Sequence, residues 1–279
     1  MLKFASASAM IAAAGLLAGC HGLTQAESNQ SAAQSSVNDV DVAPIFVDWS
    51  KSAISDDWYV SDHVLPDGHW KSDFASKNVL ALPNGLNIKM TSKTPANGSW
   101  PWAGGEIQHK ARVGFGEYHT IMRAASGSGL VSGFFTYTGD YFGTPHDEID
   151  FEFVGKSPYE VQLNSFTNGT SHGRLEHALD FDTSKNFALY SFTWAPDRIS
   201  WYVNGELVHE ITSEFHPIPQ TPAILFANLF QGREEGWVGA PEFVEGATAT
   251  YRCMSYRPTG DTTSPTCAEI YDLEYNQKD

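Results

Sequence analysis

Short apolar runs recur along the chain from residue 105 to residue 256, and Gly, Pro, Asn and Asp residues separate them. Runs of this length, rich in aromatic and β-branched residues and bounded by turn residues, are typical of β-strands. Asn204-Gly205 lies between two of them and is a dipeptide favoured in two-residue hairpins. No long segment has the 3.6-residue period of an amphipathic helix, so the pattern predicts an all-β sandwich or barrel. The expected strands are 105–113, 118–124, 131–138, 147–154, 161–167, 189–194, 199–203, 207–211, 223–230 and 247–256.

One of these strands carries acidic residues at alternate positions. Glu148, Asp150 and Glu152 alternate with Ile and Phe side chains, and the period of two in a strand places the three acids on one face. Like charges on one face repel each other and raise the pKa of at least one member, so that one acid keeps its proton near neutral pH while another is ionised. This favours acid–base chemistry on a glycosidic bond. An acidic surface strand or a calcium site is the alternative.

The distance along this strand sets a condition on the shape of the sheet. Glu148 and Glu152 are four residues apart, which is about 13 Å at ~3.3 Å per residue. A retaining glycosidase holds its two carboxyl groups roughly 5–5.5 Å apart. Both side chains must therefore lean towards Asp150, which predicts a concave, twisted sheet.

The Glu-x-Asp-x-Glu spacing resembles the signature of glycoside hydrolase family 16, in the form found in lichenases, xyloglucan-active enzymes and succinoglycan-cleaving glycanases. The match extends from about residue 45 to residue 257. It implies a concanavalin-type β-jelly-roll, a sandwich of two antiparallel sheets with a cleft on the concave face. It also implies a retaining endo-β-glycanase in which Glu148 is the nucleophile, Glu152 the general acid/base and Asp150 a supporting acid.

The same resemblance implies a polysaccharide substrate, namely a β-1,3/1,4-linked glucan or a related exopolysaccharide, and no cofactor. A transglycosylase that transfers the sugar to another sugar is an alternative. A surface lectin on the same fold is a second alternative, from a different functional class. Loss of one catalytic carboxylate would indicate the lectin, and all three carboxylates are present.

Several residues are expected to contact the glycan. Gln162, Asn164 and Phe166 share one phase of their strand, and amides both donate and accept hydrogen bonds to hydroxyl groups. The resemblance extends the role to Asn164 and Phe166, for which a buried amide ladder within the sheet is the alternative, and to further positions. For the aromatic residues among these the alternative is packing in the core, and for His146 it is a role in the turn. These further positions are Glu106, Gln108, Phe135, Tyr137, His146, Asn228, Phe230 and Trp237.

The chain departs from the lichenase pattern in three places. His146 stands where lichenases commonly have Trp, and in this it is similar to the xyloglucan-active and succinoglycan-cleaving branches. Ser72 and Gly104 occupy the places of the lichenase disulfide. Arg252 stands where the family has a calcium-binding Asp, and because Arg offers no oxygen ligand we expect no metal. No HExxH zinc motif occurs in the sequence.

The first nineteen residues have the features of an export signal. Lys3 precedes an apolar stretch that ends in Leu-Ala-Gly before Cys20, and such a segment is excluded from the folded domain. The stretch resembles a bacterial lipobox, which implies cleavage before Cys20, lipid attachment to it and anchoring in the cell envelope, at the outer membrane or cell surface. A plain secretory signal is the alternative. The expected divisions are a signal peptide at 1–19, a polar tether at 20–43, the catalytic domain at 44–258 and a tail at 259–279.

Composition narrows the choice of partners. The net charge is −16, from 17 basic and 33 acidic residues, and no basic patch occurs, which argues against nucleic acid as a partner. Aromatic residues make up 13% of the chain, including eight Trp, which favours contact with sugar rings. Once Cys20 is assigned to lipid, Cys253 and Cys267 remain as an even pair in an exported protein, so we expect a disulfide rather than two free thiols. The protein is expected to be a monomer.

Overall fold

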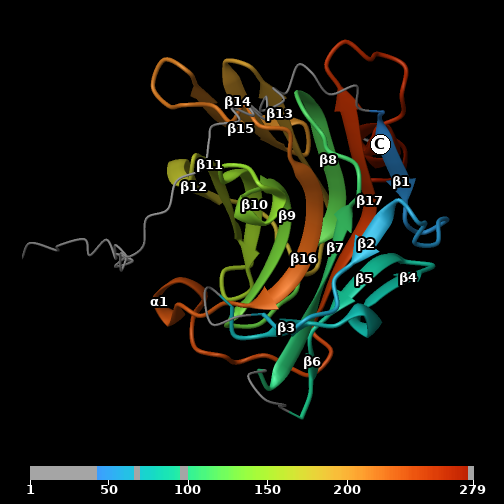
Figure 1. Ribbon diagram of the computed structural model, residues 1–279. Helices are drawn as coiled ribbons and strands as arrows, with labels where there is room; N and C mark the ends of the chain where they lie inside the picture. The colour runs from blue at the N-terminus through green and yellow to red at the C-terminus, as the bar shows by residue number, and fades with distance from the viewer. Residues whose placement is uncertain (1–42, 66–69, 95–99, 276–279) are drawn as a thin grey trace, which may run out of the picture. The chain divides into compact units, whose positions relative to one another are not determined.

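Two β-sheets dominate the computed structural model, which describes residues 43–65, 70–94 and 100–275 (Figure 1). The eight-stranded sheet contains β15 (Glu206–Thr212), β14 (Arg198–Val203), β13 (Ala188–Ala195), β8 (Gly116–Arg123), β17 (Thr248–Pro258), β5 (Gly85–Lys89) and β4 (Val79–Leu82), in that order, with β1 (Ile45–Asp48) also beside β17. The nine-stranded sheet contains β12 (Thr170–Ala178), β11 (Glu160–Thr167), β10 (Asp147–Val154), β9 (Leu130–Thr138), β16 (Ile224–Gln231), β7 (Trp102–His109) and β2 (Trp58–Val60), with β3 (Asp73–Phe74) and β6 (Thr91–Ser92) also on β7.

The core lies between the two sheets, and β10 shows how the sequence pattern creates it. Its apolar phase is buried, and the rings of Phe151 and Phe153 contact Tyr190 of β13 at centroid distances of 5.6 and 4.6 Å. Because successive side chains of a strand alternate between faces, the acidic phase of β10 is directed to the opposite face. The predicted fold class, two stacked sheets of short strands, is confirmed.

All ten expected strands are present, and the expected range 147–154 coincides with β10. The others differ at their ends by one to four residues, the largest difference being that β7 ends at His109 rather than at 113. Seven strands were not expected, namely β1 to β6 and β12.

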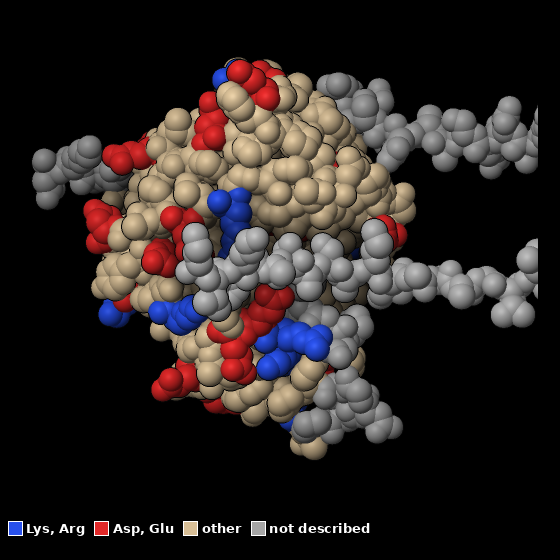
Figure 2. Space-filling view, turned by 90° about the vertical axis from the view of Figure 1, so that its left-hand side faces the viewer, with Lys and Arg blue, Asp and Glu red and all other residues tan. Residues whose placement is uncertain are grey.

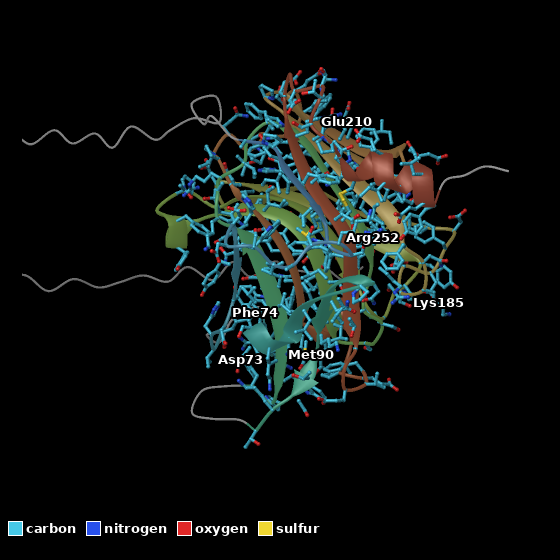
Figure 3. The ribbon with its side chains drawn as sticks, turned by 90° about the vertical axis from the view of Figure 1, so that its right-hand side faces the viewer. Asp73, Phe74, Met90, Lys185, Glu210 and Arg252 are labelled. Atoms are coloured by element: carbon cyan, nitrogen blue, oxygen red, sulfur yellow. A yellow bond between two sulfur atoms is a disulfide. The ribbon has the colours of Figure 1, made fainter. Side chains whose placement is uncertain are left out.

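The two sheets are antiparallel apart from one short parallel pairing. The two-residue strand β3 runs parallel to β7, with Phe74 opposite Gly104. Figure 3 shows Asp73 and Phe74 close to Met90, whose side chain reaches the same glycine. A Cβ at Gly104 would lie 1.9 Å from the carbonyl oxygen of Leu229, so this position has no room for a cysteine of the lichenase kind.

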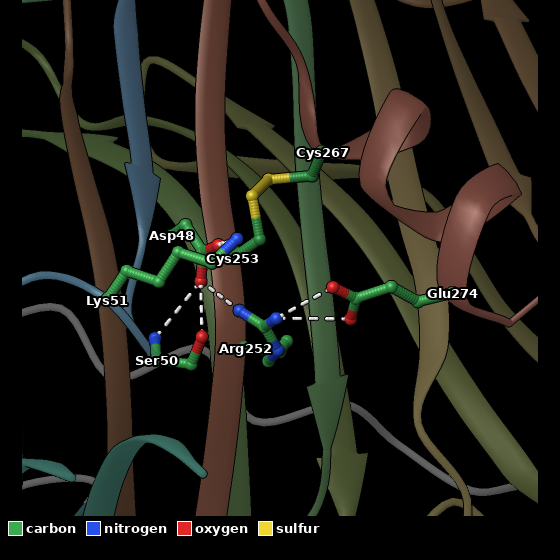
Figure 4. Close-up of polar contacts among 7 residues, drawn as sticks. All are labelled: Asp48, Ser50, Lys51, Arg252, Cys253, Cys267 and Glu274. Carbon is green, nitrogen blue, oxygen red and sulfur yellow. Dashed lines mark hydrogen bonds and ion pairs between the residues drawn. A yellow bond between two sulfur atoms is a disulfide. The ribbon is translucent and has the colours of Figure 1, made fainter. Parts of the chain in front are cut away.

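The expected disulfide between Cys253 and Cys267 is confirmed, with its Cα atoms 5.7 Å apart (Figure 4). The expected polar tail is partly helical, because α2 (Cys267–Glu274) begins at the second cysteine. Tyr271 of this helix is buried in a small cluster with Ile121 and Leu189. The disulfide therefore joins α2 to the outer side of the eight-stranded sheet.

Arg252 lies beside this disulfide and binds carboxylates from both ends of the described chain. Its guanidinium forms an ion pair with Asp48, at the end of β1. One guanidinium nitrogen, Nη2, also donates hydrogen bonds to both carboxylate oxygens of Glu274 in α2, at 2.9 and 3.1 Å (Figure 4). A cation beside Asp48 does not fit a calcium site, because Ca²⁺ requires oxygen ligands. Within residues 43–65, 70–94 and 100–275, no group of three or more His, Cys, Asp or Glu is arranged to hold a metal.

Charged side chains are scattered over the face of the molecule that lies on the left in Figure 1. Figure 2 views this face and shows Asp and Glu in several separate places, with Lys and Arg among them. Short helical turns connect strands elsewhere, namely η2 (Ser76–Asn78), η3 (Asp140–Phe142) and α1 (Glu235–Val238). None of the helices in the described ranges is long and apolar enough to span a bilayer.

Candidate active site

The register of the nine-stranded sheet places the three acids of β10 among the expected contact residues. Residues directly opposite each other on paired strands point to the same face. We call this face of the nine-stranded sheet the site face. It carries Glu148, Asp150 and Glu152 of β10, Gln162, Asn164 and Phe166 of β11, Phe135 and Tyr137 of β9, Phe226 and Asn228 of β16, and Glu106 and Gln108 of β7.

Two of the three acids have raised pKa values. Burial, followed by the charge of Glu148, raises the pKa of Glu152 to about 8, and the cation of Arg174 opposes this shift. Burial, the charges of Glu148 and Glu152, and a hydrogen bond to Glu148 raise the pKa of Asp150 well above its usual value. With a pKa of about 8, Glu152 keeps its proton at neutral pH. A carboxylic acid that keeps its proton is what a leaving-group oxygen requires.

Glu148 has a second polar partner in the residue that precedes the strand. The Nε2 atom of His146 lies 2.6 Å from Oε2 of Glu148. The imidazole is stacked on Phe166, at a centroid distance of 4.8 Å and an interplanar angle of 16°, and meets Tyr137 edge-on at 5.2 Å. His146 thus lies on the site face as its phase predicts, but its polar contact is with an acid of the site.

The β7 side of the site face contains a further acid with a raised pKa. Burial raises the pKa of Glu106 to about 7, against hydrogen bonds from Ser61 and Asn228. The Ser61 hydroxyl donates to Glu106 at 2.7 Å, and the Gln108 amide reaches the same hydroxyl at 3.4 Å. The side-chain oxygen of Asn228 is buried and accepts no hydrogen bond within the described part of the chain. Glu106, Gln108 and Asn228 therefore form one polar group.

Aromatic side chains line the middle of this face. Phe135 is stacked on Phe226 at 5.1 Å with an interplanar angle of 9°. Tyr137 meets the edge of Phe226 at 6.1 Å and continues the row to His146. Phe226 was not among the expected contacts, although it shares a phase with Asn228.

Trp237 and Phe230 lie at another part of the site, near α1. The indole nitrogen of Trp237 donates to the side-chain oxygen of Gln162 at 2.7 Å, which joins two expected contacts from distant parts of the chain. Phe230 is only 7% exposed and packs against Trp70 and Trp237, so its ring offers a sugar little surface. Asn164 accepts a hydrogen bond from Ser171 at 2.8 Å.

Residues of the eight-stranded sheet hold the site strands from behind. The indole of Trp201 donates to the backbone carbonyl of Asp150 at 3.1 Å. The hydroxyl of Tyr251 lies 2.7 Å from the carbonyl of Gly133 and 3.0 Å from that of Asn228. Sequence patterns do not indicate these contacts, because each of them joins a residue of one sheet to a residue of the other.

The acid at the start of β10, Asp147, also has a supporting position. It is 3% exposed. Its carboxylate accepts hydrogen bonds from the backbone nitrogens of Asn168 at 2.9 Å, Thr221 at 3.2 Å and Gln220 at 3.3 Å. Asp147 therefore ties the loops after β11 and before β16 to the strand that carries the three acids.

A jelly-roll sandwich with in-phase acids between amides and aromatic rings defines a carbohydrate-active protein of the glycoside hydrolase class. The family model for glycosyl hydrolases family 16 matches residues 67–246. The chain belongs to this family.

Curated relatives and solved structures agree with this assignment. The chain is 37% identical over 209 residues to a beta-glucanase of Acetivibrio thermocellus, covering 70% of this chain and 61% of that protein. It is 33% identical over 204 residues to the endo-1,3-1,4-beta-glycanase ExoK of Rhizobium meliloti, covering 73% and 75%. A beta-1,3-1,4-glucanase (lichenase) structure from a mouse hindgut metagenome superposes with a TM-score of 0.73 at 32% identity, covering 78% of this chain and all of that one. The match therefore spans about six tenths of the length of the Acetivibrio protein.

Proposed function

We propose that this protein is a retaining endo-β-glucanase that cleaves β-1,3-1,4-linked glucan or a related exopolysaccharide. The observation that carries the proposal is the acidic row of β10, in which Glu152 has a pKa of about 8 close to Glu148. A retaining mechanism requires one protonated and one ionised carboxyl group. The names of the relatives, beta-glucanase and endo-1,3-1,4-beta-glycanase, support the substrate class.

In the first step, a carboxylate oxygen of Glu148 forms a bond to the anomeric carbon. The glycosidic C–O bond breaks, its electron pair goes to the departing oxygen, and that oxygen takes the proton of Glu152. Asp150, whose pKa is raised by burial and by the neighbouring acids, shares a hydrogen bond with Glu148 and so holds the attacking group in place.

In the second step, the ionised Glu152 takes a proton from water. The water oxygen attacks the anomeric carbon, the bond to Glu148 breaks, and the carboxylate of Glu148 is restored. Two displacements at one carbon give net retention of configuration. A sugar hydroxyl in place of water would give transglycosylation by the same residues.

The proposal is tested by digesting lichenan, laminarin, xyloglucan, succinoglycan and agar with the wild type and with the variants Glu148→Gln and Glu152→Gln. We expect oligosaccharides from the β-1,3-1,4-glucan, and a loss of kcat of about 10³-fold or more in each variant. An aryl glycoside with a good leaving group separates the two roles. Glu152→Gln should still release the phenol in a burst because no proton is needed, whereas Glu148→Gln should not.

Glu210→Gln is the matched control. Glu210 lies on β15, in the other sheet, where it accepts a hydrogen bond from Ser200 (Figure 3). Turnover by Glu148→Gln at the rate of this control would overturn the assignment of the nucleophile. Binding of oligosaccharide by the wild type without cleavage would point to the lectin.

We also propose that the mature protein is a lipoprotein anchored through Cys20. The support is the sequence alone, in which Leu-Ala-Gly precedes Cys20 after an apolar stretch. Cys20 and the segments 1–19 and 20–43 lie outside the described residues, apart from residue 43. The divisions of the chain and its monomeric state remain predictions.

A further inference from the structure

His146 makes a short polar side-chain contact with the proposed nucleophile. Its Nε2 atom lies 2.6 Å from Oε2 of Glu148, and the two side chains are 34% and 20% exposed. An ionised carboxylate can only accept a hydrogen bond, so Nε2 carries the hydrogen and donates it. A bond of this length to a charged acceptor is among the stronger hydrogen bonds in proteins.

The imidazole is fixed in orientation by its neighbours. Phe166 covers one face of the ring, and Tyr137 packs against it edge-on. The backbone carbonyl of His146 accepts a hydrogen bond from Gly169 at 2.8 Å, which ties this residue to the turn after β11. Contacts from β9 and β11 therefore hold the Nε2–H group directed at Glu148.

This arrangement leaves His146 little capacity to bind sugar. One ring nitrogen is engaged by Glu148, and one ring face is covered by Phe166. Given the proposed function, on which this step rests, we propose that His146 is a positioning residue. It holds Oε2 of Glu148 so that the other carboxylate oxygen, Oε1, attacks the anomeric carbon.

The protonation state of His146 is coupled to the same acid. The hydrogen bond to Glu148, and then the charges of Glu148, Asp147 and Asp140, raise the pKa of His146 against the effect of burial. Tyr137 is the titratable group that faces the ring from β9, and Phe166 from β11 has no charge. Below this raised pKa the imidazole ring is cationic. Its charge stabilises the carboxylate of Glu148 and so makes Glu148 a weaker nucleophile. His146 should therefore contribute to the acidic limb of the pH–rate profile.

The kinetic test compares His146→Phe, which removes the donor, with His146→Gln, whose amide can still donate but does not titrate. For His146→Phe we expect kcat to fall by about 10²-fold with KM within threefold, as for a misplaced reacting group. The rate of inactivation by an epoxyalkyl β-glycoside, which alkylates the nucleophile, should fall in parallel. His146→Gln should recover most of the activity and change the acidic limb.

His119→Gln is the matched control, because His119 also lies near a glutamate, with Nε2 3.5 Å from Glu117, but on β8 of the other sheet. It should leave kcat and the pH profile as in the wild type. A rise in KM with unchanged kcat in His146→Phe would instead show a sugar contact. Equal activity of His146→Phe and the wild type would also overturn the proposal.

A second measurement does not depend on catalysis. The ring protons of His146, assigned by their absence in His146→Gln, are titrated by NMR in the wild type and in Glu148→Gln. We expect the pKa of His146 to fall in Glu148→Gln, and an unchanged pKa would refute the contact. If the pKa falls but the wild type cleaves no glucan, the proposed function fails while the contact stands.

Discussion

The positive charge of Arg174, on the edge strand β12, influences the pKa of Glu152. Its side chain is 54% exposed and lies 3.8 Å from Glu176, and its charge lowers the pKa of Glu152 while burial and Glu148 raise it. The general acid must be protonated for the first step. The alkaline limb of kcat/KM should therefore report the pKa of Glu152, near 8.

Replacing Arg174 by Gln should move this alkaline limb to higher pH. The sign follows because loss of a cation makes ionisation of Glu152 less favourable, so its pKa rises further. Since Arg174 is exposed, added salt should reduce the difference between variant and wild type. The measurement is kcat/KM against pH at low and high ionic strength, with Arg198→Gln on β14 as the control. A shift to lower pH would contradict the electrostatic role.

Spacing along a strand predicted which residues share the site face, but not how they contact each other. Period two placed Glu148, Asp150 and Glu152 on one phase, and the register then set Gln162 and Asn164 beside them. Local spacing carries this information because strand geometry is regular. The bonds from Trp201 to Asp150 and from Trp237 to Gln162 depend on chain folding between distant positions. No spacing in the sequence could have indicated them.

Among the elements, strands with strong alternation were predicted and the weakly patterned ones were not. β10 buries its apolar phase fully, whereas most residues of the edge strand β12 are at least partly exposed and alternate little in polarity. β3 and β6 have two residues each, too few to show any period. α2 has eight residues, and an isolated helix of that length is not stable in water. Its contacts must therefore stabilise it.

Arg252 supplies some of the contacts that stabilise α2. The variant Arg252→Ala should show how much they contribute to the free energy of unfolding. The side chains of Arg252 and Asp48 are 11% and 9% exposed. Removing the cation takes from the nearly buried Asp48 its partner on β17 but leaves its ion pair with Lys51 and its hydrogen bonds from Ser50, so the loss should be about 2 kcal/mol. Chemical unfolding monitored by fluorescence measures this, with the disulfide intact in both proteins.

Arg198→Ala is the control for Arg252→Ala, since Arg198 forms an exposed pair with Asp197 whose side chains are 50% and 59% exposed. Such surface pairs contribute little to stability, so this variant should unfold like the wild type. If Arg252→Ala is no less stable than Arg198→Ala, the ion pairs of Arg252 with Asp48 of β1 and Glu274 of α2 do not stabilise the fold.

At the scale of the whole molecule, the two sheets have separate tasks. The nine-stranded sheet carries the acids, amides and aromatic rings of the site face. The eight-stranded sheet receives β1, the first described strand, and packs α2 on its outer side. The first described strand therefore belongs to the sheet that does not carry the acids.

The proposed anchor can be tested by replacing Cys20 with Ser in the full chain. If Cys20 is lipidated, the wild type should sediment with membranes, partition into the detergent phase of Triton X-114 and carry acyl chains by mass spectrometry. Cys20→Ser lacks the acceptor thiol, so it should lose all three properties while keeping the proposed glucanase activity, because the site residues lie wholly within the described part of the chain. Cys253→Ser with Cys267→Ser is the control for loss of cysteine and should stay with the membrane. Identical fractionation of Cys20→Ser and the wild type would exclude the lipid anchor and leave a plain secretory signal.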